Sequence, residues 1–421
     1  MDRRRFLATS GAAALGAGLS PRLRPARAAA AAPRTILLHS QWQTTNIGDI
    51  GHTPGTLRIL EDHLPEAHVI LLAATLDDRI RDLLTRRFPK LEIIRGSFKN
   101  GEITTQALKD AYRRADLCIK NSGMGEDTSF LAFARKSGKP YGLYGQSYFP
   151  RFVEGPEGPA HVDLLDGASF VYCRDSRTLA TLKKAGVKSP VLEFAPDGCF
   201  GIDVRDDARA ADLMRRKGLE DRKFITIQLR TNTPKSNGTD SPGNPLHPTP
   251  EQVADDERRA AKLRALITAW VEKTGNKVLI APEVDKEMAH NKRLLHDPLP
   301  EPIRDKVANC DAFWNADEAA SVFARAHTCV CHEPHSLIIA LANGTPIIHT
   351  FSEFHSPKCW MFEDVGLGEW LLEIDETPVE TMVETLLAID ADQPAARAKV
   401  AKAMDFVHRR QADTMKVVGS L

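Results

Sequence analysis

Residues 330–350, VCHEPHSLIIALANGTPIIHT, constrain the fold more than any other part of the chain. An apolar run leads into a polar turn, where Pro334 disfavours helical geometry for the residue before it. Residues 336–342 read as an apolar helical segment, which Asn343-Gly344 ends because these residues tolerate a left-handed conformation. A second apolar run follows directly. This strand–helix–strand order predicts a parallel sheet with the polar turn at its carboxyl edge, where ligands bind.

The same alternation of apolar runs and helical segments extends along most of the chain. Strand-like runs occupy residues 35–39, 68–72, 91–95, 117–120, 141–144, 169–173, 191–195, 224–229 and 277–281. Such alternation predicts parallel pairing with helices on both faces of each sheet. We therefore expect an α/β fold with two Rossmann-like domains facing each other across a cleft.

Changes in composition along the chain predict four parts. They are a signal peptide (1–32), an N-terminal Rossmann-like domain (33–205), a C-terminal Rossmann-like domain (222–376) and helices that pack back across the domains (377–421). A charged stretch between the domains reads as a linker helix. The run from Thr231 to Pro250, rich in Pro, Gly, Asn, Ser and Thr, reads as either a functional lid or a disordered loop.

The N-terminal segment has the pattern of an export signal. Residues 3–7 read RRRFL, similar to a twin-arginine signal, and an apolar run too short to span a membrane follows. We expect a periplasmic or extracellular protein, with an uncleaved membrane anchor as the alternative. The chain has seven cysteines, an odd number, and several lie in apolar runs, which predicts buried free thiols and not a disulfide framework.

The distribution of charge argues against a nucleic-acid partner. The whole chain has 56 basic and 56 acidic residues, but six arginines and only one acid precede Pro33. The remaining 50 basic and 55 acidic residues give that part a charge of about −5. Binding to a phosphate backbone needs a basic face, which this balance does not favour.

Six short motifs, in their order along the chain, resemble the polysaccharide pyruvyl transferase family. They are NIGDI (46–50), ADLCIKNSGMG (115–125), KPYGLYGQSYFP (139–150), YCRDSRTL (172–179), PDGCF (196–200) and the helix at His335 with HSPK (355–358). The resemblance implies a GT-B-like fold. It also implies transfer of an enolpyruvyl unit from phosphoenolpyruvate to two hydroxyls of one sugar in a glycan, with no metal or other cofactor.

The resemblance assigns donor-side roles to four residues. His335 matches the family histidine and would protonate the enol carbon, and a helix N-terminus would lower its pKa. Ser336 follows it on the donor side, while Arg174 and Lys358 would bind the anionic groups of the donor. For His335 the alternative is a helix-capping role; for Arg174 it is a structural ion pair with a neighbouring aspartate, at position 175 or 197.

Four further residues are predicted on the acceptor side. Asn46 and Asp49 lie in a loop after the first strand, where a carboxylate could bind a sugar hydroxyl, although capping of the next helix would also explain them. That helix is expected to begin near Pro54. Gly123 and Gly125 would allow close approach of a ligand, or simply form a tight turn.

Two observations bear on rival interpretations. Glu333 stands where the family has an arginine, and its negative charge would disfavour phosphoenolpyruvate unless another cation neutralises it. A cluster of potential metal ligands matches no known ligand spacing, so no metal site is predicted: Cys329, Cys331, His332, His335, His327 and His349. The leading hypothesis is an exported pyruvyl transferase. The alternatives are an exported glycan-binding protein with the same fold that lacks transfer, and a glycosyl-type transferase with another donor.

Overall fold

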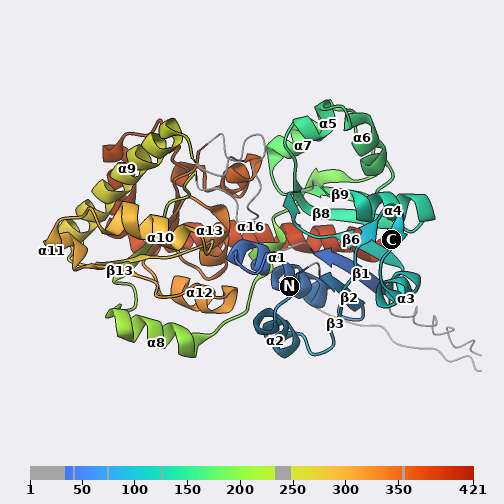
Figure 1. The fold of residues 1–421 in the computed structure, drawn as a ribbon, viewed down its shortest axis with the longest axis horizontal. Helices are drawn as coiled ribbons and strands as arrows, with labels where there is room; N and C mark the ends of the chain where they lie inside the picture. The colour runs from blue at the N-terminus through green and yellow to red at the C-terminus, as the bar shows by residue number, and fades with distance from the viewer. Residues whose placement is uncertain (1–33, 41–42, 74, 125–126, 233–247, 353–355) are drawn as a thin grey trace, which may run out of the picture. The chain divides into compact units, whose positions relative to one another are not determined.

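Two parallel β-sheets carry the fold (Figure 1). The computed structural model describes residues 34–40, 43–73, 75–124, 127–232, 248–352 and 356–421. Residues 34–421 form one compact unit by their contacts. The predicted signal peptide and most of the predicted loop between Thr231 and Pro250 lie outside the described residues.

The first sheet has eight strands in the order β10-β9-β8-β6-β1-β2-β3, with β7 paired beside β8. Its strands are β1 (Thr35–Ser40), β2 (His68–Ala73), β3 (Glu92–Ile94), β6 (Leu117–Lys120), β7 (Gly123–Met124), β8 (Tyr141–Ser147), β9 (Phe170–Cys173) and β10 (Leu192–Phe194). The connecting helices are α1 (Ile47–His63), α2 (Asp78–Arg87), α3 (Gln106–Arg114), α4 (Ser129–Ser137), α5 (Arg151–Glu154), α6 (Gly158–Asp166) and α7 (Ser176–Lys184). A small antiparallel pair, β4 (Phe98–Lys99) and β5 (Glu102–Ile103), and a 3-10 turn, η1 (Gly198–Gly201), complete this half.

The second sheet has five strands in the order β13-β12-β11-β14-β15. They are β11 (Phe224–Gln228), β12 (Lys277–Ile280), β13 (Val307–Asn309), β14 (Thr328–Cys331) and β15 (Ile347–His349). Around them lie α8 (Asp207–Lys217), α9 (Pro250–Thr274), α10 (Glu287–Asn291), η2 (Lys292–His296), α11 (Glu301–Arg304), α12 (Ala316–Phe323), α13 (Pro334–Ala342), η3 (Pro357–Trp360), α14 (Met361–Asp364) and η4 (Gly368–Trp370).

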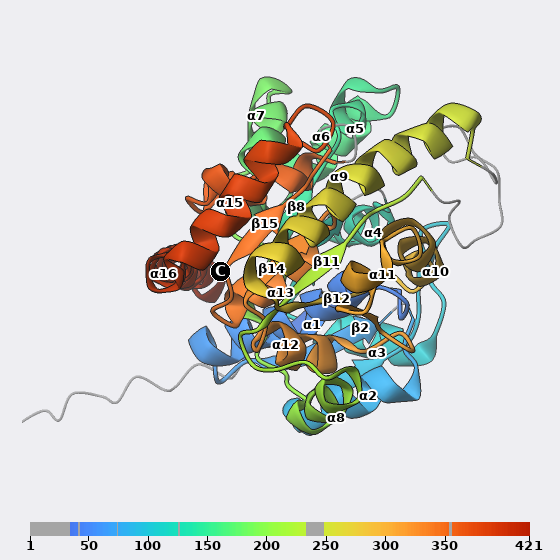
Figure 2. The same cartoon turned by 90° about the vertical axis from the view of Figure 1, so that its left-hand side faces the viewer.

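The two C-terminal helices join both halves. Helix α15 (Val379–Ala391) lies beside α9 on the second half (Figure 2). Helix α16 (Gln393–Ser420) then crosses from one half to the other. Near its start, Arg397 Nη1 donates to the Gly344 carbonyl (2.7 Å). Thirteen residues further along, Arg410 Nε donates to the Phe194 carbonyl of the first half (2.7 Å). No helix among the residues described is both long and apolar enough to cross a membrane.

One apolar core runs through both halves. In β1, Ile36 and Leu38 pack into the same core as the second sheet, whereas Leu37 points into a separate core on the opposite face of the first sheet. This split follows from the two-residue period of a strand. The central strands β6, β8, β9, β11 and β14 are buried along their whole lengths, as expected for parallel strands covered on both faces.

Three predicted boundaries are corrected by the structure. Helix α1 begins at Ile47, and Pro54 lies inside it, because burial of nearly the whole helix outweighs the missing proline N–H. Strand β8 continues past Tyr144 to Ser147, because β7 pairs with its end. The helical spacing of apolar residues over 255–273 predicts a helix that begins at Asp255. Helix α9 instead begins five residues earlier, at Pro250, because Thr249 and the residue at the third helical position form a capping box.

Candidate functional site

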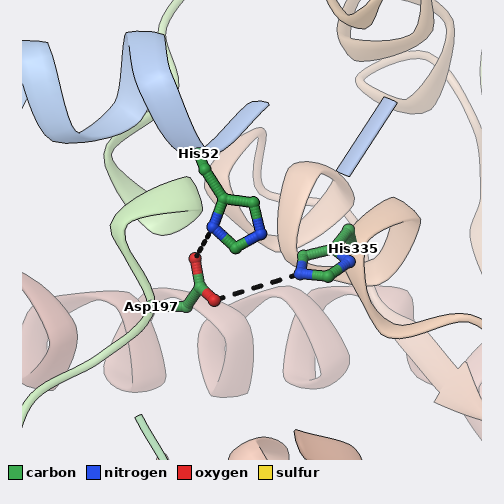
Figure 3. A group of neighbouring side chains, drawn as sticks. All are labelled: His52, Asp197 and His335. Atoms are coloured by element: carbon green, nitrogen blue, oxygen red, sulfur yellow. Dashed lines mark ion pairs between the residues drawn. The ribbon is translucent and has the colours of Figure 1, made fainter. Parts of the chain in front are cut away.

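A buried cluster of His52, Asp197 and His335 lies where the two halves meet (Figure 3). Asp197 follows β10 in the first sheet, His335 opens α13 after β14 in the second, and His52 comes from α1. His52 Nδ1 is 3.2 Å from Asp197 Oδ1, and His335 Nε2 is 3.9 Å from Asp197 Oδ2. The two imidazole rings meet edge to face, with centroids 4.7 Å apart. One carboxylate therefore lies between two imidazoles.

Arg174 holds this carboxylate from the side of the first sheet. Its Nη1 is 2.6 Å from Asp197 Oδ2, and its Nε donates to Ser147 Oγ at 2.8 Å. The side chain is only 1 % exposed, so in this conformation its guanidinium binds Asp197 and presents no surface to a ligand. This is the structural ion pair that the sequence allowed as an alternative. The geometry therefore supports a positioning role for Arg174.

Asp197 stays ionised because of these neighbours. Burial alone would raise its pKa, but His52, Arg174 and His335 together hold the pKa of Asp197 well below its usual range. A buried carboxylate with such partners is a fixed negative charge. It can stabilise positive charge that develops on either imidazole.

Glu283, which the sequence analysis missed, holds the other side of His335. Its Oε1 is 3.2 Å from His335 Nδ1, and its Oε2 accepts a hydrogen bond from the Ser336 backbone N–H at 2.6 Å. The Glu283 carbonyl accepts from the Ile47 N–H at 3.0 Å, which ties the second half to the start of α1. Glu283 follows β12 at the carboxyl edge of its sheet. The rule that selected the turn after β14 would also have found this residue.

Burial sets the protonation of the Glu283–His335 pair. It is the largest influence on both groups, and it disfavours the charged form of each. Burial and the nearby Glu333 carboxylate raise the pKa of Glu283 to about 7. Burial, followed by His52 and Lys358, holds the pKa of His335 well below its usual range. Near neutral pH the imidazole is therefore uncharged, and the carboxyl group is poised between its two forms.

A glycine lets α1 approach the His335 ring. A Cβ atom built on Gly48 would lie 2.4 Å from the Cγ and Nδ1 atoms of His335, closer than real Cβ contacts allow. Since a methyl group would displace the imidazole, residue 48 must be small if the ring is to keep this position.

Comparisons with known proteins agree with this architecture. The sequence profile described as polysaccharide pyruvyl transferase matches residues 46–350. The chain belongs to the polysaccharide pyruvyl transferase family. No curated protein matches the chain as a relative.

Solved structures extend the likeness to the fold of this pyruvyl transferase family member. UDP-GlcNAc 2-epimerase from Neisseria meningitidis, bound to UDP-GlcNAc, gives a TM-score of 0.56 at 9% identity over 92% of this chain and 100% of that one. HepE from Anabaena, in complex with UDP and glucose, gives a TM-score of 0.53 at 11% identity, over 92% of this chain and 99% of that one. A UDP-glucose:anthocyanidin 3-O-glucosyltransferase gives a TM-score of 0.50 at 10% identity, over 92% of this chain and 99% of that one. The predicted α/β, GT-B-like fold class is thus confirmed.

Two cations flank Glu333, the residue that departs from the family pattern. Arg230 Nη1 is 3.2 Å from its Oε1, and Lys358 Nζ is 3.6 Å from its Oε2. Arg230 follows β11, while Lys358 lies in the turn η3. The three side chains carry a formal charge of +1 together, so Glu333 has the neutralising cations that the sequence analysis named as the condition for binding an anionic donor. The Arg230 side chain is 33 % exposed, so it could still meet an anion.

Of the residues predicted on the acceptor side, Asn46 and Asp49 lie near the junction of the two halves, and Gly123 lies beside β8. Asn46 Oδ1 caps α1 by accepting from the N–H groups of Gly48 (2.8 Å) and Asp49 (3.3 Å). Asp49 Oδ2 accepts from the Gln43 N–H at 3.3 Å. The two hydrogen bonds of Asn46 match the capping alternative. Gly123 forms β7, and Gly125 lies outside the described residues, so the ligand-binding roles of all four stay predictions.

The sequence cluster of cysteines and histidines forms no metal site among the residues that the structure describes. All seven cysteines are free and buried, as predicted for thiols in apolar runs, and Cys331 Sγ donates to Gln228 Oε1 at 3.1 Å. The group with ligand atoms close enough for a metal is His52, Asp197 and His335, whose ligand atoms lie within 4.8 Å of one another. Because the Arg174 guanidinium already binds the Asp197 carboxylate, this group suits proton chemistry better than a cation.

Proposed function

We propose that the protein is an exported pyruvyl transferase, which uses phosphoenolpyruvate to place a cyclic pyruvyl ketal on two hydroxyls of one sugar in a glycan. Membership in the family supports transferase activity. The observation that carries the proposal is the pairing of His335 Nδ1 with the Glu283 carboxyl group at 3.2 Å, while Asp197 lies 3.9 Å from Nε2 of the same ring. The basic and apolar pattern of residues 1–32 supports export.

The donor would be bound by its two anionic groups. Phosphate and carboxylate oxygens suit a guanidinium fork and an ammonium group, which Arg230 and Lys358 supply. Both now pair with Glu333, so donor binding would exchange one anionic partner for another. The net positive charge of this trio favours that exchange.

Transfer requires a proton at C3 of the enolpyruvyl group. In our proposal, His335 delivers its Nε2 proton to C3 while Nδ1 takes the proton of Glu283, so the imidazole never becomes a long-lived cation. The first sugar hydroxyl adds to C2, the C2–O bond to phosphate breaks, and the second hydroxyl closes the ketal. Of the two hydroxyl protons, one returns to Glu283 and His335 and restores their starting protonation. The other leaves with phosphate, so atoms and charge balance.

Asp197 would stabilise this step electrostatically. Its carboxylate is 3.9 Å from His335 Nε2, the nitrogen that gives up the proton. A fixed negative charge in a buried site stabilises the positive charge that develops as C3 is protonated. His52 and Arg174 keep the carboxylate in place, and they act as positioning residues.

The second function to consider is an exported glycan-binding protein with the same fold. Burial favours it, because His335 is 3 % exposed and a reacting group must meet its substrate. A third possibility, a glycosyl-type transferase with another donor, shares the fold of the solved structures.

One assay separates these functions. Mature protein is incubated with phosphoenolpyruvate and a panel of bacterial surface glycans, while phosphate release is followed and the ketal is detected by NMR. We expect glycan-dependent phosphate release, which His335→Ala lowers at least about 100-fold. Glycan binding without phosphate release would support the binding protein, and release only from a nucleotide-sugar donor would support the third function.

A further inference from the structure

A cavity lies on the first half of the molecule, at the carboxyl ends of β7 and β8 and against α5 and α6. Its volume is about 470 Å³. Its lining residues are Met124, Ser147, Tyr148, Phe149, Arg151, Phe152, Gly155, Pro156, Glu157 and His161. This size is within the usual range for a small-molecule site. We call it the aromatic pocket.

Stacked rings form one wall of the aromatic pocket. Phe152 stacks on Tyr148 with centroids 4.2 Å apart, and on His161 with centroids 4.0 Å apart and planes only 5° from parallel. His161 Nδ1 is 2.6 Å from the Phe152 carbonyl, which fixes the imidazole on this stack. Because Phe152 is covered on both faces, this stack is a rigid support, and the partly exposed phenyl ring of the lining is that of Phe149. An apolar wall of this kind suits the C–H face of a pyranose ring, which is also apolar and flat.

The polar groups of the pocket suit a neutral ligand rich in hydroxyls. Glu157 Oε2 is 3.6 Å from His161 Nε2, and the guanidinium of Arg151 lies 4.4 Å over the Phe149 ring. One carboxylate and one guanidinium balance in formal charge. A carboxylate accepts hydrogen bonds from hydroxyls and a guanidinium donates them, which is the pairing that a sugar needs.

Two contacts connect the aromatic pocket to the proposed catalytic cluster. Ser147, which lines the pocket, accepts a hydrogen bond from Arg174, which in turn holds Asp197. Met124, on the pocket wall, accepts from Ser356 Oγ at 3.7 Å, and Ser356 caps the turn that carries Lys358. The pocket is thus next to both the proton-transfer side and the anion-binding side of the site.

From these observations we infer that the aromatic pocket binds a pyranose ring of the glycan acceptor, adjacent to the sugar that receives the pyruvyl group. The inference rests on the proposed function for the identity of the glycan. The occupant itself is argued from the pocket, because stacked rings with balanced polar groups match a neutral sugar and not the anionic donor. The donor cations are absent from the pocket lining.

Two variants and a control test the aromatic pocket directly. Phe149→Ala removes a partly buried ring from the lining, and Glu157→Gln removes an exposed carboxylate, so neither should prevent folding. Glu154→Gln is the matched control, because Glu154 is an exposed glutamate of α5 outside the lining. The probes are the methyl glycosides of glucose, galactose, mannose and N-acetylglucosamine, with binding followed by saturation-transfer NMR.

We expect at least one glycoside to bind, with affinity lowered about tenfold by Phe149→Ala and severalfold by Glu157→Gln. Glu154→Gln should bind like the native protein, and the affinity of all variants for phosphoenolpyruvate should be unchanged. Equal glycoside affinity in native protein and both pocket variants, or no glycoside binding at all, would overturn the inference. Pocket-dependent binding with no phosphate release would instead overturn the transferase proposal and leave the sugar site standing.

Discussion

Replacement of Glu283 by glutamine isolates the proton that the proposed mechanism uses. The amide keeps the shape of the side chain, and its oxygen can still accept from the Ser336 N–H, which now donates to Glu283 Oε2 at 2.6 Å. The amide nitrogen would face His335 Nδ1. The variant therefore loses an ionisable proton with little change in packing.

The expected effect on catalysis follows from the role of a general acid. Such groups contribute roughly 10²–10⁴-fold to a rate. We expect Glu283→Gln to lower kcat for phosphate release by about 100-fold at pH 7. The KM for phosphoenolpyruvate should change little, because Arg230 and Lys358 are untouched.

The same variant should also change how the free energy of unfolding depends on pH. Burial raises the pKa of Glu283 from 4.5 in the unfolded chain to about 7, so the folded state binds more protons between these values. Stability of the native protein therefore falls as pH rises through this window. Between pH 5.5 and 8 the loss is on the order of 2 kcal/mol. Glutamine does not titrate, so Glu283→Gln should gain that amount relative to the native protein over the same interval.

Urea unfolding at pH 5.5 and pH 8, followed by tryptophan fluorescence, measures this difference. Glu287→Gln is a matched control, because burial also raises the pKa of Glu287 to about 7 while its carboxylate contacts Thr231. The control should show a similar pH-dependent gain in stability and keep its kcat. A stability difference between native protein and Glu283→Gln that is the same at both pH values would refute the reasoning.

Three further variants test other contacts of the site. Gly48→Ala should displace the His335 ring, which should lower the free energy of unfolding in urea by about 1–3 kcal/mol and abolish most of the phosphate release. Full activity of this variant would show that the His335 ring does not need to lie so close to residue 48. Arg230→Ala should raise the KM for phosphoenolpyruvate about tenfold or more with little change in kcat, and an unchanged KM would place the donor elsewhere. Arg174→Ala should cost about 3–5 kcal/mol of stability, because it leaves the buried Asp197 without its guanidinium partner; a loss below about 1 kcal/mol would contradict the positioning role.

Much of the fold could be predicted from local patterns. Short apolar runs separated by helical segments predict parallel strands, and the strand Leu117–Lys120 lies at the predicted bounds. The predicted start of the helix after β1, near Pro54, is too late. A proline inside a helix is unfavourable, and the sequence shows the proline but not the burial of the helix that outweighs it. Burial of α1 depends on segments far along the chain.

The site was predicted in part. His335 and Arg174 were both singled out, and Asp197 connects them in one buried cluster. His52 was missed because it looked like one of several polar residues in a loop before a helix. The structure makes it part of a buried helix, where its imidazole binds a carboxylate that follows a strand almost 150 residues later.

Charge at the site could not be predicted from single positions. Considered alone, the negative charge of Glu333 predicts that this region repels an anionic donor. Its partner Arg230 lies about 100 residues earlier and reaches it only because β11 and β14 are neighbours in the sheet. Pairing of distant strands decides which charges meet, and no local pattern contains that information.

A crystal structure of the mature protein soaked with phosphoenolpyruvate tests the central claim most directly. The account predicts phosphate oxygens on Arg230 and Lys358, with C3 of the enolpyruvyl group about 3–3.5 Å from His335 Nε2. Phosphoenolpyruvate bound away from these cations, or an imidazole still sealed off from the bound donor, would contradict it.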